Sequence, residues 1–262
     1  MAAVRTPLRT PRGTILAIEG ASGAGKTAIA RALALAEGSV RLAEALHYGA
    51  PLSIRFTTDA QLKRIEERLV RREIHRWALA ERLARSGRSV VLDTAPWGPL
   101  SYTYGLVRSG RAGPGTLRYV ARLLRAAMSD GRLGSPDLVL YLDVPVAERR
   151  RRAARDRLRH PPMLFERHLA ASRGERELWL GRWSRIVPVR RLRVRSGESA
   201  PSVVGRALRA WRASPLREPR ARASTQRLEP DLRVGARRVR RDGALATSQR
   251  AARTVARGPG QR

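Results

Sequence analysis

The chain has 262 residues, with 54 Lys and Arg against 22 Asp and Glu, and a formal net charge of +32. It contains no cysteine, which excludes a disulfide framework and a cysteine-based metal site. No apolar run approaches the ~20 residues of a membrane span. The basic stretch at residues 1–12 lacks the apolar core of a signal peptide. We therefore expect a cytoplasmic protein without membrane contact.

The positive charge has two explanations. A basic surface favours nucleic-acid binding when its charges gather on one face. Here the arginines are spread along the whole chain, which favours a general bias toward Arg. Only Lys26 and Lys63 are lysines. A lysine retained among so many arginines indicates a chemical role for Lys26.

The most informative stretch is Gly20-Ala21-Ser22-Gly23-Ala24-Gly25-Lys26-Thr27, which fits G-x-x-x-x-G-K-[ST] at every fixed position. An apolar run of strand length, residues 14–18, precedes it, and the helix formers of residues 28–36 follow it. In that context the glycines let backbone N–H groups approach phosphate oxygens, and the helix start attracts anions. Lys26 is predicted to reach the β- and γ-phosphates, and Thr27 to offer its hydroxyl to Mg²⁺.

Strands and helices alternate along the rest of the chain. Further strands are predicted at residues 40–42, 89–93, 137–144 and 186–194. Helices are predicted at residues 58–86, 102–109, 116–128, 146–158, 163–183 (as one helix or two) and 202–211. Thr58 or Asp59 caps the first of these helices, which either runs to Gly87 unbroken or breaks near Arg71. Pro188 favours an edge position for the last strand. The alternation predicts an α/β fold, a three-layer sandwich with a five-stranded parallel sheet between helices.

Asp93 stands at the tip of the strand 89–93. Ligands of such folds bind beyond the carboxyl ends of the strands, where the glycine-rich loop also lies. An acid at this place handles Mg²⁺ or a reacting hydroxyl in phosphoryl transfer. The structural alternative is an Asp that caps the following loop.

An arginine cluster follows the strand 137–144. Its members are Arg149, Arg150, Arg151, Arg152, Arg155 and Arg157. Arg151 and Arg155 are four residues apart and share one helical face, where they could meet the charge on a transferring phosphoryl group. The alternative is a solvated basic helix. The four histidines show no metal-ligand spacing, and Trp77, Trp179 and Trp183 are expected in the core.

Residues 14–34, with the pair Glu19-Gly20, resemble the opening of thymidylate kinases and related deoxynucleoside kinases. The strand 136–145 resembles that family's next strand, and the following helix resembles its Arg-rich lid, with Arg151 and Arg155 nearest the lid's arginine pair. When Asp93 is set on the family's Asp-Arg-Tyr/Phe motif, Arg72 falls on an Arg that contacts the substrate base. Tyr102 then falls on an aromatic of the substrate pocket. The resemblance covers about residues 14–211.

Two departures concern the substrate loop. The family Arg after Asp93 is Thr94 here, and the Ser that usually follows is Gly98. A hydroxyl cannot supply the planar, paired charge that Arg offers a phosphate. The pocket is therefore predicted to favour an uncharged nucleoside over dTMP, unless another arginine such as Arg55 or Arg71 substitutes.

The combined prediction is an ATP- and Mg²⁺-dependent kinase that acts on a nucleoside or nucleotide. Lys26, Asp93, Arg151 and Arg155 are the predicted catalytic residues. Thr27 and Asp93 are the predicted metal residues, and Arg72 and Tyr102 bind the acceptor. The alternatives are a P-loop ATPase that binds nucleic acid, a polynucleotide kinase, and an ATPase without an acceptor. The oligomeric state is left open, with a homodimer among the possibilities.

Three parts are predicted. They are a flexible basic arm (1–13), a P-loop kinase-like domain (14–211) and a disordered Arg-rich tail (212–262). The tail has 14 Arg against 4 acidic residues, no aromatic residue and no sustained periodicity.

Overall fold

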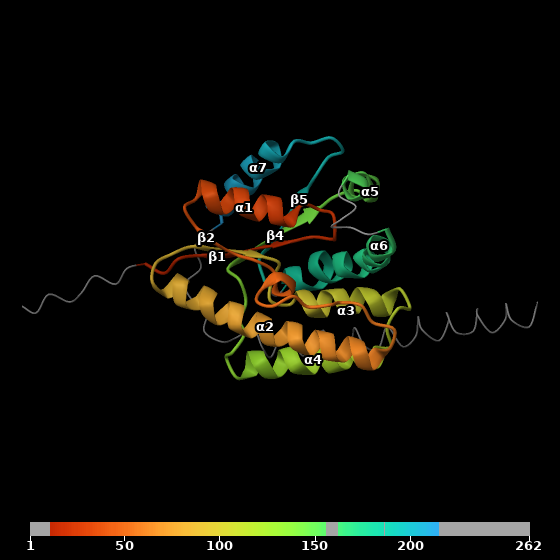
Figure 1. The fold of residues 1–262 in the computed structure, drawn as a ribbon. Coiled ribbons are helices and arrows are strands. Elements are labelled where there is room, and N and C mark those ends of the chain that lie inside the picture. The colour runs from red at the N-terminus through yellow and green to blue at the C-terminus, as the bar shows by residue number, and fades with distance from the viewer. Residues whose placement is uncertain (1–10, 156–161, 186, 215–262) are drawn as a thin grey trace, which may run out of the picture.

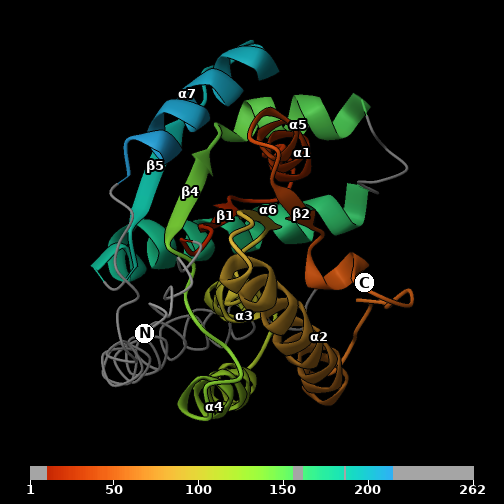
Figure 2. The ribbon, with the colours of Figure 1, turned by 90° about the vertical axis from the view of Figure 1, so that its left-hand side faces the viewer.

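The computed structural model describes residues 11–155, 162–185 and 187–214. Its sheet has five strands, all paired in parallel, in the order β2-β3-β1-β4-β5. Figure 2 shows β4 and β5 side by side. The strands are β1 (Ile15–Glu19), β2 (Val40–Leu42), β3 (Val90–Asp93), β4 (Leu138–Asp143) and β5 (Val189–Arg193). The predicted parallel α/β sheet is confirmed, and so is the edge position of the last strand.

Helices cover both faces of this sheet (Figure 1). The α-helices are α1 (Lys26–Ala36), α2 (Asp59–Arg85), α3 (Gly98–Arg108), α4 (Pro114–Ser129), α5 (Val146–Arg155), α6 (Pro162–Glu177) and α7 (Ala200–Arg212). Shorter helical turns are η1 (Ala45–His47), η2 (Leu178–Arg182) and η3 (Trp183–Arg185). The result is a three-layer sandwich, as predicted.

The alternation of side chains along the strands builds two cores. Leu16 and Ile18 of β1 point to the face covered by α1 and α7, in one apolar cluster with Trp211. Ile15 and Ala17 point to the opposite face, in a cluster with residues of α2, α3 and α4. Both faces of a parallel sheet are covered in this way because its strands are apolar on both sides.

The tryptophans pack in the second core, as expected. Trp179 and Trp183 are each 1% exposed and meet edge to face, with ring centroids 4.5 Å apart. Trp97 stacks on Trp179 at 6.1 Å. These rings fix the segment that follows β3 against the chain that leads into β5.

The helix bounds differ from the predictions in several places; α6, for example, ends at Glu177, and the predicted helical stretch to residue 183 continues as η2 and η3. α2 is one unbroken helix, so a break near Arg71 is wrong; Thr58 caps it in a reciprocal capping box with Gln61. α3 begins at Gly98, four residues before the predicted start at residue 102. The reason is Pro99, whose fixed φ suits the first turn of a helix.

Most of the predicted arm and tail lies outside the described residues, as does the end of the predicted helix 146–158. At the described C-terminal end, Arg212 pairs with Glu37 of the α1 C-cap at 2.7 Å. No helix in the described ranges is long and apolar enough to cross a membrane.

Candidate active site

The glycine-rich loop connects β1 to α1 at the carboxyl edge of the sheet. Gly20, Gly23 and Gly25 have φ values of 145°, 77° and 91°, which L side chains rarely adopt. A Cβ on Gly20 would also come within 2.7 Å of the Leu142 carbonyl oxygen. Gly25 is the N-cap of α1 and supplies no side-chain cap. The first N–H groups of α1 are therefore left for a ligand, which is the arrangement of an anion site.

Lys26 lies among carboxylates. Its Nζ donates to the Gly20 carbonyl oxygen at 2.8 Å, and its charge acts on Glu19, Glu44 and Glu175. These acids come from β1, from the N-cap of η1 and from α6. The lysine therefore stands at the point where three elements meet the loop.

Burial raises the pKa of two of these carboxyl groups to near neutral pH. Burial raises the pKa of Glu19 to about 8 against the opposing charge of Lys26, and raises that of Glu175 to about 7. Glu44 differs: burial opposes its ionisation, but a hydrogen bond from His47 and the charge of Lys26 lower its pKa overall. Glu44 is thus the carboxylate beside Lys26 that stays ionised at neutral pH.

Asp93 ends β3, in register with Ile18 of β1. It is 2% exposed, and its Oδ2 accepts from Arg41 Nη1 at 3.2 Å. Its Oδ1 is buried without a hydrogen-bond partner. The sheet edge therefore presents one carboxylate oxygen that the described residues leave unsatisfied.

Thr94 has a φ of 84°, and it is the one non-glycine residue with positive φ in the described ranges. Such a conformation is rare for a β-branched residue and costs on the order of 1–3 kcal/mol. Its N–H donates to the Ile18 carbonyl at 3.1 Å, and its own carbonyl accepts from Arg76 Nη2 at 2.9 Å. Hydrogen bonds to its N–H and to its carbonyl oxygen hold the strained residue at the centre of the site.

Arg76 is fully buried on α2 and pairs with Glu73 at 2.6 Å. Arg72, one turn earlier, donates to the carbonyls of Ala45 and Leu46 at 3.2 and 3.1 Å. It also donates to the Ala50 carbonyl. Arg72 thus fixes the η1 turn that carries Glu44. Its contact with a substrate base stays a prediction.

Tyr102 lies on α3 beside a small apolar cluster of Leu62, Leu106 and Ala171, with Phe56 packed against it. Burial raises the pKa of Tyr102, so its hydroxyl stays protonated. Next to it in the chain, the buried Thr103 hydroxyl faces Glu66 of α2 without a well-formed hydrogen bond. Both Glu66 oxygens lack partners, and burial raises the Glu66 pKa to about 8.

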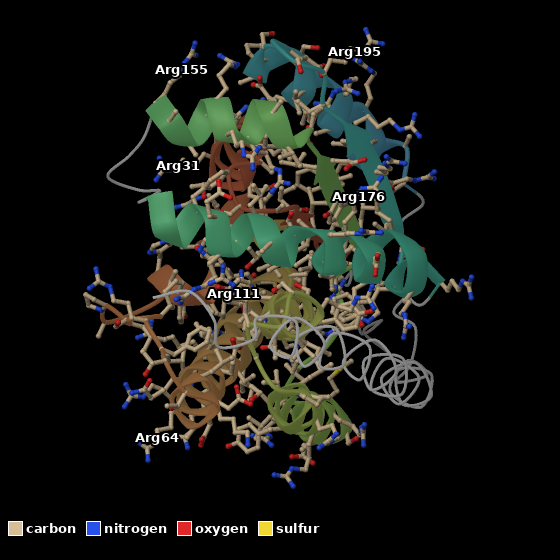
Figure 3. The ribbon with its side chains drawn as sticks, turned by 90° about the vertical axis from the view of Figure 1, so that its right-hand side faces the viewer. Arg31, Arg64, Arg111, Arg155, Arg176 and Arg195 are labelled. Atoms are coloured by element: carbon tan, nitrogen blue, oxygen red, sulfur yellow. The ribbon has the colours of Figure 1, made fainter. Side chains whose placement is uncertain are left out.

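The arginines of α5 do not all face the loop. Arg152 Nη1 donates to the Ala24 carbonyl of the loop at 3.0 Å. Arg151 instead forms two hydrogen bonds with Glu148, at 2.7 and 2.8 Å, and Arg155 is exposed (Figure 3). Arg152 Nε also donates to Glu148 Oε1 at 2.8 Å, and the hydrogen bonds from both arginines lower the pKa of Glu148 to about 2.

Sequence reasoning missed several residues of this site: Arg41, Glu44, Glu66, Arg76 and Arg152. Glu44 had a usable signal, since it follows the strand 40–42 at the same edge as the loop. Arg152 was within the recognised cluster, but spacing alone did not select it. Glu66 and Arg76 look like ordinary residues of a surface helix until packing buries them.

The described residues contain no group of three or more His, Asp or Glu side chains that could hold a metal. The parallel sheet, with the glycine-rich loop and its lysine between β1 and α1, defines a P-loop α/β fold. No family model matches the sequence, and no curated protein is significantly similar to it.

Solved structures share the fold. A deoxyadenosine kinase from M. mycoides with bound dATP is 14% identical, with a TM-score of 0.55 over 76% of this chain and 100% of that one. The same enzyme with dCMP and dCDP gives 12% identity, a TM-score of 0.54 and coverage of 76% and 99%. A thymidylate kinase from Candida albicans is 16% identical, with a TM-score of 0.58 over 77% and 92%.

Proposed function

We propose that this protein is an ATP-dependent phosphotransferase that phosphorylates a nucleoside-like acceptor. The observation that carries the proposal is the complete glycine-rich loop at the start of α1, with Lys26 inside it and the unsatisfied Asp93 oxygen on a neighbouring strand. The similarity to deoxyadenosine and thymidylate kinases supports this choice at the level of the fold.

The donor half of the site consists of the loop Gly20–Thr27 and the arginines of α5. Backbone N–H groups of the loop bind phosphate oxygens, and Lys26 exchanges its bond to the Gly20 carbonyl for a phosphate. Arg152 holds the loop through the Ala24 carbonyl. Arg151 and Arg155 close over the transferring group.

Mg²⁺ fits the donor set. Mg²⁺ is usually held by one or two protein oxygens together with waters and substrate phosphates, so a larger acidic cluster is not required. Thr27 and the unsatisfied Oδ1 of Asp93 are the side-chain oxygens that would hold the ion or its water. When bound, Mg²⁺ neutralises charge on the β- and γ-phosphates.

The acceptor half lies between α2, α3 and η1. Asp93 or Glu44 accepts the proton of the reacting hydroxyl; Glu44 is the ionised carboxylate beside Lys26. Thr94 brings no charge to the reacting end, the charge of Arg41 is paired with Asp93, and Arg76 is committed to Glu73 and to the Thr94 carbonyl. Tyr102 and Arg72 shape the remainder of the pocket. An uncharged hydroxyl acceptor therefore suits this site better than a monophosphate.

The test compares kcat/KM for thymidine, deoxyadenosine, deoxyguanosine and dTMP with ATP and Mg²⁺. We expect a nucleoside to be the better acceptor. Lys26→Ala should abolish transfer, because its ammonium acts on phosphates, whereas the matched control Lys63→Ala on α2 should behave as wild type. Turnover of dTMP with no nucleoside phosphorylated would overturn the acceptor assignment, and full activity of Lys26→Ala would overturn the site.

A further inference from the structure

Among the residues that the structure describes, Arg41 forms an ion pair with Asp93. The Nη1–Oδ2 distance is 3.2 Å, and the side chains of Arg41 and Asp93 are 26% and 3% exposed. Only one carboxylate oxygen is engaged, since Oδ1 has no hydrogen-bond partner. The pair is therefore not the bidentate fork that saturates a carboxylate.

The strand register explains how Arg41 reaches this carboxylate. Arg41 on β2 lies opposite Val91 on β3, two residues before Asp93. Residues two apart share one face of a sheet, about 6.6 Å apart along the strand, and the long Arg stem spans that distance. Since β2 is an outer strand, the guanidinium stays partly in water while it contacts a buried carboxylate.

The sequence analysis named Arg55 and Arg71 as possible replacements for the Arg missing at position 94. Neither pairs with Asp93 as Arg41 does. Arg71 pairs with Glu67 on the outer side of α2, with its side chain 71% exposed. Arg55 is exposed in the segment between η1 and α2. Arg41 thus brings its positive charge to the Asp93 carboxylate from β2, a strand that the sequence analysis did not connect with the site.

We propose that Arg41 is a positioning residue that orients Asp93 and sets the affinity of the site for a divalent cation. This inference rests on the proposed function, in which Asp93 serves Mg²⁺. A guanidinium that shares the carboxylate with the metal repels it and competes for the same oxygens. The charge of Arg41 therefore weakens metal binding, and its hydrogen bond keeps Oδ2 occupied so that Oδ1 serves the metal or its water.

The experiment measures Mn²⁺ binding to the full chain by electron paramagnetic resonance, in saturating ADP and without an acceptor. Removal of a unit charge a few ångströms from the metal should tighten Mn²⁺ binding by about tenfold in Arg41→Gln. Arg41→Met, which keeps the aliphatic stem, should show the same change. Arg41→Lys, which keeps the charge, should stay within about twofold of wild type.

Arg12 offers a matched control. It is 28% exposed and pairs with Asp137 at 3.0 Å, and Asp137 precedes β4 at the amino edge of the sheet. Arg12→Gln lowers the net charge by the same amount but far from the loop, so its Mn²⁺ affinity should not change. Both variants should also be compared in turnover, where Arg41→Gln alone should lower kcat.

Two results would overturn the role of Arg41 while leaving the proposed function standing: unchanged or weaker Mn²⁺ binding in both Arg41→Gln and Arg41→Met, or an equal shift in Arg12→Gln. If the wild-type chain binds ADP no better than Lys26→Ala does, the phosphate site itself fails, and this inference fails with it.

Discussion

Glu66 shows how a single side chain can make stability depend on pH. Its carboxyl is 1% exposed, both oxygens lack hydrogen-bond partners, and burial raises its pKa to about 8. The unfolded chain ionises the same group near pH 4.5. Between these values the folded state binds the extra proton, so the free energy of unfolding falls as the pH rises.

We therefore predict that the melting temperature falls between pH 6 and pH 8.5, by on the order of 5 °C. Glu66→Gln, which keeps the shape and cannot ionise, should reduce this fall, and the remainder should come from Glu19, Glu73 and Glu175, whose pKa values burial also raises. Glu73 is a suitable comparison, because burial also raises its pKa, to about 7, but Arg76 pairs with it. A pH dependence that is identical in wild type and Glu66→Gln would contradict the assignment.

The strained Thr94 is the second feature at this scale. Its positive φ turns the chain between β3 and α3, and Ala95 N–H then donates to Glu19 Oε1 at 2.8 Å. The same turn buries Glu19 and directs the Thr94 carbonyl to Arg76. Strain at one residue thus organises three others around the site, which is where strained residues tend to occur.

At the scale of elements, the arginines of α5 have different partners. Arg152 contacts the loop backbone, whereas Arg151 pairs with Glu148 and Arg155 is exposed. We predict that Arg151→Ala or Arg155→Ala lowers kcat more than it raises the KM for ATP, because charge on the transferring group is met more strongly in the transition state.

Arg152→Ala should instead raise the KM for ATP, since it loosens the Ala24 carbonyl in the phosphate loop. Initial-rate kinetics over a range of ATP concentrations separates the two effects. Arg150→Ala is a matched control, as Arg150 is exposed on the same helix and lies near Glu166. A pure KM effect for Arg151 and Arg155 would mean that they only hold ATP.

Much of the element pattern could be predicted because local rules decide it. The strands read as short apolar runs, the capping residues of α2 stand in the sequence, and the loop before α1 has a fixed pattern. Pro99 was the misread signal, since a proline in the first turn starts α3 at Gly98, whereas the helix was predicted to begin at residue 102.

The candidate site was predicted only where one segment carries it. Lys26 was predicted from the glycine-rich motif, and Asp93 from its place at the end of a strand. The structure places both at the sheet edge. Glu44 could have been found from its place after the strand 40–42, but Arg41 and Arg76 depend on which strand and helix lie next to them in space. Composition and periodicity do not contain that information, and an Arg in a chain so rich in Arg gives no signal of its own.

At the scale of the whole molecule, the positive charge surrounds the domain. The labelled arginines of Figure 3 come from separate elements, with Arg31 on α1, Arg64 on α2 and Arg176 on α6. Of these, Arg176 is neutralised locally by Asp143 at 2.9 Å. This distribution favours a general bias toward Arg over a nucleic-acid footprint, which should gather on one face.

We predict that a chain ending at Ser214 melts within about 2 °C of the full-length protein, because the sequence beyond it lacks the apolar residues needed to pack on the domain. This shortened chain retains α7 and the Arg212–Glu37 ion pair. Differential scanning calorimetry measures this. A loss of several degrees would show that the tail docks on the domain.

The same truncated chain tests the nucleic-acid alternative. If positive charge of the tail causes binding to nucleic acid, filter binding should lose most of its affinity and salt dependence after truncation. Steep salt dependence that survives in the domain would favour a nucleic-acid substrate or partner instead.

The contact between α3 and α6 has a mechanical consequence. A Cβ on Gly105 would collide with the Ala171 carbonyl, and one on Gly174 would come within 2.9 Å of the Gly105 Cα, so the two backbones touch with no side chain between them. Two helices that are packed at such a short distance cannot slide past each other without a steric clash. Tyr102 on α3 and Glu175 on α6 therefore travel as one rigid unit, so a displacement of α6 is transmitted to Tyr102 and to the wall of the proposed acceptor pocket.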